Sequence, residues 1–159
     1  MKIALPPIID AGRVILILGT MPGEKSIASQ QYYANRGNQF WRLLFAVFDE
    51  PFSVNYDERL KFLQRNRIGL WNVLEKCNRE GSSDNKIKNE HPNDLPSFFE
   101  RWPNITHVYF ESMAAAKFYA KYFEKSESMT YNVLPSTSGQ YAVKNFEQKL
   151  AEWKTLQNH

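Results

Sequence analysis

Hydrophobic residues along the chain follow two patterns, short continuous runs and helical spacing. Residues 13–18 (RVILIL) form a short, β-branched apolar run that ends at a glycine, which is typical of a strand buried on both faces. In residues 38–48 the apolar side chains, among them Phe40 and Trp41, recur three and four positions apart. They form a wide stripe that predicts a helix packed on a core. Residues 56–66 repeat this helical spacing.

The same patterns continue to the C-terminus. Asp94 is placed to cap a helix that Pro103 would stop near residue 102. The segments complete an alternation of strands (68–73, 106–110 and 130–134), helices (94–102, 113–124 and an amphipathic tail at 141–156) and one polar loop (78–92).

Strands separated by helices favour a parallel sheet with right-handed crossovers and helices on both faces. We therefore predict an α/β fold, a three-layer α/β/α sandwich around a four-stranded parallel sheet. A length of 159 residues suits one domain over residues 1–159. Ligands of such sheets bind beyond the carboxyl ends of the strands. This rule points to the loops that follow residues 18, 73 and 134.

Composition argues against secretion, a membrane-spanning segment and a cysteine-based disulfide or zinc site. The first residues lack the features of a signal peptide, and no apolar run approaches the roughly 20 residues that span a bilayer. The single cysteine, Cys77, forms no internal disulfide and no cysteine-based zinc cluster. We therefore expect a protein of a reducing cytoplasm.

The net charge of +3 decides little, but its distribution is uneven. Residues 59–88 carry eight basic side chains against three acids, whereas residues 49–58 carry four acids and no base. A local basic excess suits contact with a phosphate backbone. The solvated faces of ordinary helices would give the same pattern, so this stretch alone leaves both interpretations open.

Three segments combine polar groups with flexible backbone. Gly19-Thr20-Met21-Pro22-Gly23 lets the backbone approach a ligand, or is merely a tight turn. Residues 32–41 (YYANRGNQFW) offer aromatic faces on which a base can stack, beside Asn38, which also stands where a helix cap is expected. Residues 134–141 (LPSTSGQY) place consecutive hydroxyls after a strand, which suits phosphate contacts or the capping of the last helix.

Other chemistries have little support. No HExxH pattern or paired His and Cys spacing suggests a metal site, and we expect neither a metal nor another cofactor. Ser136 and Ser138 lack the GxSxG nucleophile elbow, and Cys77 has no histidine near it in sequence. His107 lies in a predicted strand, where a core position is the usual role.

Taken in order, GTMPG, YYANRGNQFW, GLWNVLE with the following Cys77, and LPSTSGQYA resemble the uracil-DNA glycosylase superfamily. The closest likeness is to its hypoxanthine/uracil branch, followed by mismatch-specific uracil/thymine glycosylases. The resemblance covers nearly the whole chain. It implies a fold of that superfamily, flipping of a damaged nucleotide out of DNA, and hydrolysis of the glycosidic bond without metal or cofactor. The implied partner is DNA that contains deaminated bases, hypoxanthine or uracil, and we expect a monomer.

The resemblance also implies roles for residues. Relatives often orient the attacking water with an Asp or Asn in the first loop, where this chain has Met21. In the hypoxanthine branch that the chain resembles, the working asparagine is the one in the NxFW element, which implies this role for Asn38. Tyr33 would stack on the flipped base, and backbone N–H groups near Thr20 would bind its carbonyl oxygen. The expected base-binding residues are Gly19, Thr20, Met21, Pro22, Gly23, Tyr33 and Asn72. Those expected to bind DNA are Ser136, Thr137, Ser138, Gly139, Gln140 and Tyr141, the first three at phosphates and Gln140 or Tyr141 in the gap left in the helix.

Three segments depart from the branch. Asn35-Arg36-Gly37 replaces the usual His-Pro-Arg, Gly139-Gln140 replaces Pro-Ala, and Glu111-Ser112 replaces Asn-Gly. The first two lie in predicted substrate-facing loops and bear on base preference. The third adds an acid near the pocket or has no effect, and we favour no effect. Three other functions fit the same sequence: a mismatch-specific uracil/thymine-DNA glycosylase, a non-catalytic nucleic-acid-binding module, and a hydrolase of free nucleosides or nucleotides.

Overall fold

Four parallel strands form the central sheet of the computed structural model, which describes residues 1–159. In spatial order they are β3 (Ile68–Asn72), β2 (Ile15–Gly19), β6 (His107–Phe110) and β7 (Thr130–Val133). Every residue of β2 is buried, because this strand has a neighbour on each edge and is covered on both faces. Ile17 pairs with Leu70 of β3 and Tyr109 of β6. The predicted four-stranded parallel sheet is confirmed.

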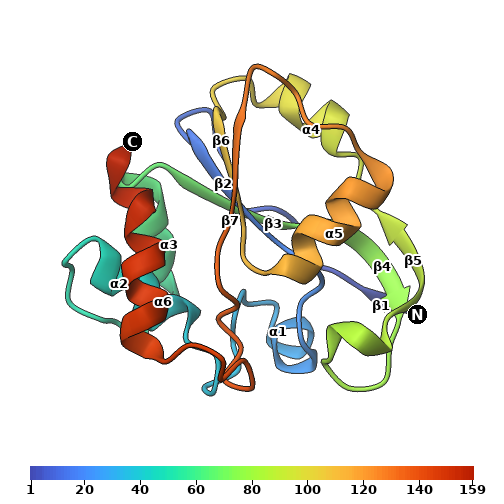
Figure 1. Cartoon of the computed structure of the whole chain (residues 1–159), viewed down its shortest axis with the longest axis horizontal. Coiled ribbons are helices and arrows are strands. Elements are labelled where there is room, and N and C mark those ends of the chain that lie inside the picture. The colour runs from blue at the N-terminus through green and yellow to red at the C-terminus, as the bar shows by residue number, and fades with distance from the viewer.

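Helices cover both faces of the sheet, which confirms the predicted three-layer arrangement (Figure 1). Successive side chains of a strand point to opposite faces. Ile15 and Ile17 therefore pack in one core, with α2 (Phe40–Val47), α3 (Tyr56–Arg65) and α6 (Phe146–Trp153). Leu16 and Leu18 pack in the other, with α4 (Leu95–Arg101) and α5 (Met113–Tyr122).

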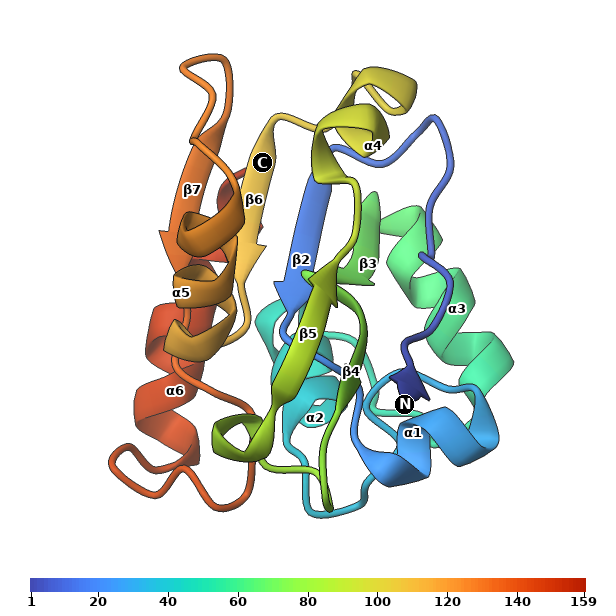
Figure 2. The ribbon, with the colours of Figure 1, turned by 90° about the vertical axis from the view of Figure 1, so that its right-hand side faces the viewer.

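The face of the central sheet that α4 and α5 cover also carries a small antiparallel sheet, which the sequence did not predict (Figure 2). Its strands are β1 (Lys2–Ile3), β4 (Leu74–Asn78) and β5 (Lys88–Pro92), with β4 in the middle. The prediction of a loop over residues 78–92 is therefore wrong at its end. No residue of β5 is fully buried, so backbone pairing with β4, not an apolar pattern, defines this strand.

Three further elements are short. The helix α1 (Glu24–Ser29) was not predicted, because Ser26 is its one buried residue and it has no apolar stripe. Two 3-10 turns, η1 (Asp84–Lys86) and η2 (Lys154–Asn158), complete the chain. The last helix begins later than predicted, at Phe146, because Asn145 forms a capping box with Gln148. No helix in the structure combines the length and apolar character needed to cross a membrane.

The strand order creates the place for a site. The strand β2 comes first along the chain but lies between β3 and β6 in the sheet. The chain leaves β2 towards one edge of the sheet and later continues from β6 towards the other edge, so the strand order reverses between β2 and β6. In an open parallel sheet, a crevice forms beyond the carboxyl ends of the strands at such a point. Gly19, Asn72, Phe110 and Val133 end the four strands at this edge.

Candidate functional site

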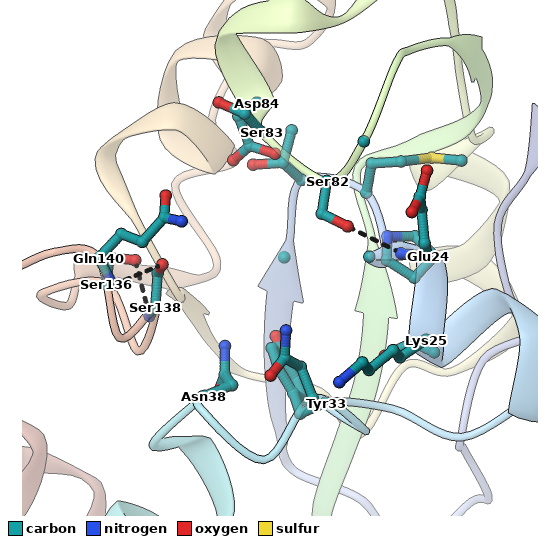
Figure 3. Close-up of a pocket in the computed structure, with 18 of the residues that line it drawn as sticks. Glu24, Lys25, Tyr33, Asn38, Ser82, Ser83, Asp84, Ser136, Ser138 and Gln140 are labelled. Carbon is teal, nitrogen blue, oxygen red and sulfur yellow. Dashed lines mark hydrogen bonds between the residues drawn. The ribbon is translucent and has the colours of Figure 1, made fainter.

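A cavity of about 830 Å³ opens at this edge of the sheet (Figure 3). Segments that follow all four parallel strands contribute to its wall. The lining comes from residues 19–26, the tyrosine and asparagine loop before α2, Asn72, residues 80–86, Glu111, and residues 136–140. The structure thus brings together the three segments that the sequence singled out, and adds residues 80–86, which it did not.

The first loop brings its backbone close to the cavity. A Cβ atom on Gly19 would lie 3.0 Å from both the Tyr33 hydroxyl and the Asn72 Nδ2 atom, so glycine lets these side chains approach the backbone closely. Met21 and Gly23 line the cavity, and their backbone N–H groups donate no hydrogen bond within the protein. The Met21 side chain packs in the core between the sheet and helices α4 and α5, as suits a side chain without a strong hydrogen-bonding group.

Tyr33 forms an aromatic wall of the cavity. Its ring stacks on Phe40 with centroids 3.8 Å apart and an angle of 12° between the planes. Phe40 itself is fully buried and is a packing residue, as predicted. Burial, reinforced by the negative charge of Glu111, raises the pKa of the Tyr33 hydroxyl well above its usual value, so the phenol is neutral. The stack fixes the orientation of the Tyr33 ring.

Asn72, at the end of β3, presents an unused acceptor to the cavity. The residue is buried and its Oδ1 atom has no hydrogen-bond partner in the protein. A buried carbonyl without a partner costs about 1–3 kcal/mol, so such groups are rare in the absence of a ligand. A ring N–H of a bound molecule would satisfy it.

Asn38 lies across the cavity from Asp84 and shares a wall with the serine loop (Figure 3). Its Oδ1 atom accepts a hydrogen bond of 2.8 Å from the backbone N–H of Phe40, the first residue of α2. The capping role considered from the sequence is thus partly realised, although the formal cap position belongs to Gln39. Because Oδ1 is anchored in this way, the Nδ2 end of the amide faces the cavity.

The loop after β7 is held by internal contacts on three sides. Thr137 has no exposed surface, and its backbone N–H and hydroxyl both donate to Glu111 Oε1, at 2.9 and 2.5 Å. Gly139 lies against the carbonyl of Gly37, and the buried Lys149 donates to the carbonyl of Ser138. Thr137 therefore supports the loop from inside, which corrects its predicted contact with DNA.

The other predicted members of this loop are placed differently. Ser136, Ser138, Gly139 and Gln140 line the cavity, whereas Tyr141 does not and instead receives the Lys149 ammonium over its ring. The Ser138 hydroxyl accepts from the backbone N–H of Gln140. The loop does not cap the last helix, because Asn145 does so.

Two acids lie in the cavity wall: Glu111, for which the sequence favoured no effect over an acid near the pocket, and Asp84, which the sequence did not assign. Glu111 follows β6, is buried, and has its pKa raised to about 7, chiefly by loss of hydration. Asp84, on η1, is half-buried and its pKa is also raised by burial, against the opposing effects of Thr20 and Arg79. The negative charge of Asp84 also raises the pKa of Glu111.

Both outcomes have identifiable causes. Glu111 stands directly after a predicted strand, so the carboxyl-end rule, applied to all four strands, favours the alternative of an acid near the pocket. Residues 80–84 lie far from the other loops in sequence and reach the cavity because β4 and β5 carry them there. Ser82 then accepts a hydrogen bond from the backbone N–H of Glu24 and closes this side.

The basic stretch of residues 59–88 does not form one surface. On α3, Arg59 packs on the rings of Trp41 and Phe52, and Arg65 pairs with Glu50. Of the eight basic residues, Lys86 is the one that lines the cavity. A second lysine, Lys25 on α1, also lines it and is drawn in Figure 3.

Comparisons with known proteins agree on one family. The model of the family described as "Uracil DNA glycosylase superfamily" matches residues 6–158. The chain is 38% identical over 162 residues to a hypoxanthine DNA glycosylase of Methanosarcina acetivorans, with 99% of each chain covered. It is 43% identical over 118 residues to a hypoxanthine DNA glycosylase of Methanosarcina barkeri, covering 74% of this chain and 75% of that protein.

A solved structure supports the same relationship. A solution NMR structure of a Methanosarcina acetivorans protein assigned to the uracil DNA glycosylases superposes with a TM-score of 0.82. The two chains are 36% identical, and the match covers 99% of each.

Proposed function

This chain belongs to the uracil DNA glycosylase superfamily, and we propose that it removes deaminated bases from DNA by hydrolysing the bond between base and sugar. Residues 1–159 act as one monofunctional glycosylase domain, and the monomer needs no metal or other cofactor. The observation that carries the proposal is the grouping, in one cavity, of a stacked aromatic ring, an unpartnered amide oxygen and Asn38.

The cavity suits a base that has left the DNA stack. Hypoxanthine and uracil each carry a ring N–H next to a carbonyl group. The ring N–H donates to the unpartnered Oδ1 of Asn72, and the free N–H groups of Met21 and Gly23 donate to a carbonyl oxygen. Stacking on Tyr33 contributes about 1–3 kcal/mol and offsets the few kcal/mol that base flipping costs.

The reaction itself needs positioning and electrostatic stabilisation. The bond between sugar C1′ and the base nitrogen breaks, and both electrons leave with the base. A water oxygen adds to the cationic sugar carbon and gives up a proton, and the departing base gains one. Asn38 cannot act as a strong base. Because the Phe40 N–H holds its Oδ1 atom, the Nδ2 group that faces the cavity, not the oxygen, positions this water by donating a hydrogen bond to it. Donors of the first loop stabilise the negative charge on the leaving base.

Contact with DNA extends from the rim of the cavity. Ser136 and Ser138 bind phosphates flanking the flipped nucleotide, and Gln140 fills the space it leaves in the duplex. Phosphate contacts of this kind position the DNA without reading its sequence. Lys25 and Lys86 add positive charge at the same opening.

The direct test is base release from labelled duplexes in the presence of EDTA. Duplexes with one hypoxanthine, one uracil or no modified position are incubated with the protein, and alkali then cleaves at any abasic site. We expect cleavage at hypoxanthine or uracil and none in the unmodified duplex. The absence of cleavage in every duplex and in single strands would refute the proposal, and strand cleavage without alkali would refute the monofunctional assignment.

A further inference from the structure

Glu111 offers one free oxygen to the cavity. The two hydrogen bonds from Thr137 both go to its Oε1 atom, while its Oε2 atom has no partner in the protein. The side chain lines the cavity at the carboxyl end of β6, next to the point between β2 and β6 where the strand order reverses. Because Thr137 holds one oxygen from the loop after β7, the position of the other is restricted at the wall of the cavity that Glu111 lines.

The surroundings of Glu111 keep this carboxyl group neutral over an unusual pH range. Loss of hydration is the main cause, and Asp84 on η1 adds a like charge, so the pKa rises to about 7. Lys149 on α6 and the hydrogen bonds from Thr137 act in the opposite direction. The neighbouring Tyr33 is neutral, since burial raises the pKa of its phenol.

A neutral carboxyl group differs from a carboxylate in what it can recognise. It has an O–H that donates a hydrogen bond, whereas a carboxylate only accepts. Deamination makes the complementary change on a base, because it replaces an exocyclic amino group, a donor, with a carbonyl group, an acceptor. Adenine becomes hypoxanthine and cytosine becomes uracil in this way.

We propose that Glu111 is a specificity-determining residue that, as a neutral acid, donates a hydrogen bond from Oε2 to the carbonyl oxygen created by deamination. This inference rests on the proposed function and adds the group that distinguishes the damaged base from its parent. The exocyclic amino group of the parent base is a hydrogen-bond donor and not an acceptor. It therefore cannot accept a hydrogen bond from the O–H of Glu111. Ionised Glu111 repels the carbonyl oxygen, so recognition is lost as pH rises.

Replacement by glutamine separates this role from simple packing. In Glu111→Gln the Thr137 N–H requires an acceptor, so the amide oxygen faces Thr137 and the Nε2 donor faces the cavity. The variant therefore mimics the neutral acid at every pH. Glu111→Ala removes the donor altogether.

The experiment compares single-turnover base release from the more reactive duplex at about pH 6 and about pH 8.5. For the unaltered protein we expect the rate to fall by about tenfold or more between these values, as expected for loss of one proton at a pKa near 7. For Glu111→Gln we expect the ratio of the two rates to be near one. Glu111→Ala should release base about tenfold to a hundredfold more slowly than Glu111→Gln at both values.

Asp84→Asn is the matched control, because Asp84 faces the same cavity and its pKa is also raised. If Glu111 is the titrating group, this variant keeps a rate that falls with pH. A parallel fall in the unaltered protein and in Glu111→Gln would overturn the proposal, as would equal rates for the Gln and Ala variants. Release that is independent of pH would refute the role of Glu111 alone, whereas no release at any pH would refute the proposed function with it.

Discussion

Asn38 combines a structural contact with its proposed catalytic role. Its Oδ1 atom accepts the N–H of Phe40 at the start of α2, while the rest of the amide faces the cavity. A substitution that removes the side chain therefore affects stability and chemistry together. The two effects are distinguishable because they belong to different atoms.

We predict that Asn38→Ala lowers the rate of base release by about a hundredfold or more. The lost cap lowers the free energy of unfolding by about 0.5–2 kcal/mol. Asn38→Asp keeps an oxygen for the Phe40 N–H and should retain the stability. Urea unfolding of both variants and single-turnover kinetics of the Ala variant test this. Near-normal release by folded Asn38→Ala would exclude Asn38 from the chemistry.

Glu111 also predicts a pH dependence of stability. Its pKa is higher in the folded protein than the usual 4.5, so between about pH 4.5 and about pH 7 the folded state binds more protons than the unfolded chain. The free energy of unfolding therefore falls as pH rises through this range, by at most a few kcal/mol.

Glu111→Gln has no such proton to lose. We expect its melting temperature, relative to that of the unaltered protein, to increase from about pH 5 to about pH 8. Scanning calorimetry across this range measures the difference. A constant difference would show that Glu111 has no shifted pKa in the free protein, independently of any activity.

At the scale of elements, the site depends on contact between two loops that are about a hundred residues apart in sequence. The loop before α2 and the loop after β7 meet where Gly139 touches the carbonyl of Gly37. Lys149 of α6 ties both together, because its ammonium donates to Gln39 and to the carbonyl of Ser138. The relative position of Asn38 and the serine loop follows from these contacts.

We predict that Gly139→Ala reduces base release, because the added Cβ would lie 2.5 Å from the Gly37 carbonyl oxygen and must separate the loops. An effect of about tenfold to a hundredfold is expected from displacing groups by about 1 Å. Gly37→Ala is the control in the same contact, since its Cβ would meet only the Asn35 side chain, at 3.4 Å. Equal rates for the two variants would contradict this account.

At the scale of the whole molecule, two lysines lie at the cavity, and only one of them belongs to the basic stretch of residues 59–88. Lys25 and Lys86 come from different elements and line the same opening. Lys61, on α3, lies in the basic stretch but its nearest charge is Glu58 of the same helix, at 3.6 Å. We therefore expect Lys25 and Lys86 to contact DNA and Lys61 not to.

We predict that Lys25→Ala and Lys86→Ala each reduce the slope of log affinity against log salt concentration by about one unit, through loss of one phosphate contact. Lys61→Ala should leave the slope unchanged. Fluorescence anisotropy with a duplex that contains hypoxanthine, over a series of salt concentrations, measures the slopes. A reduced slope for Lys61→Ala would restore the interpretation of residues 59–88 as one DNA-binding surface.

Sequence patterns alone predict the central sheet, the main helices and three of the segments that line the cavity. Apolar runs and helical spacing are local signals, because each records how one segment meets a core. The short elements β5 and α1 were not predicted, because β5 has no buried side chain and α1 buries only Ser26. The assignments of Asn38, Tyr33 and Asn72 came from a resemblance and remain proposals about function.

The surroundings of each group in the cavity depend on the folded structure and could not be predicted from the sequence. Thr137 faces inward because Glu111 accepts its hydrogen bonds, and Glu111 has a raised pKa because distant segments exclude water from it. Asp84 reaches the cavity because β4 and β5 pair. Burial, charge coupling and the orientation of a hydroxyl depend on residues brought together by folding, and no local pattern in the sequence encodes them.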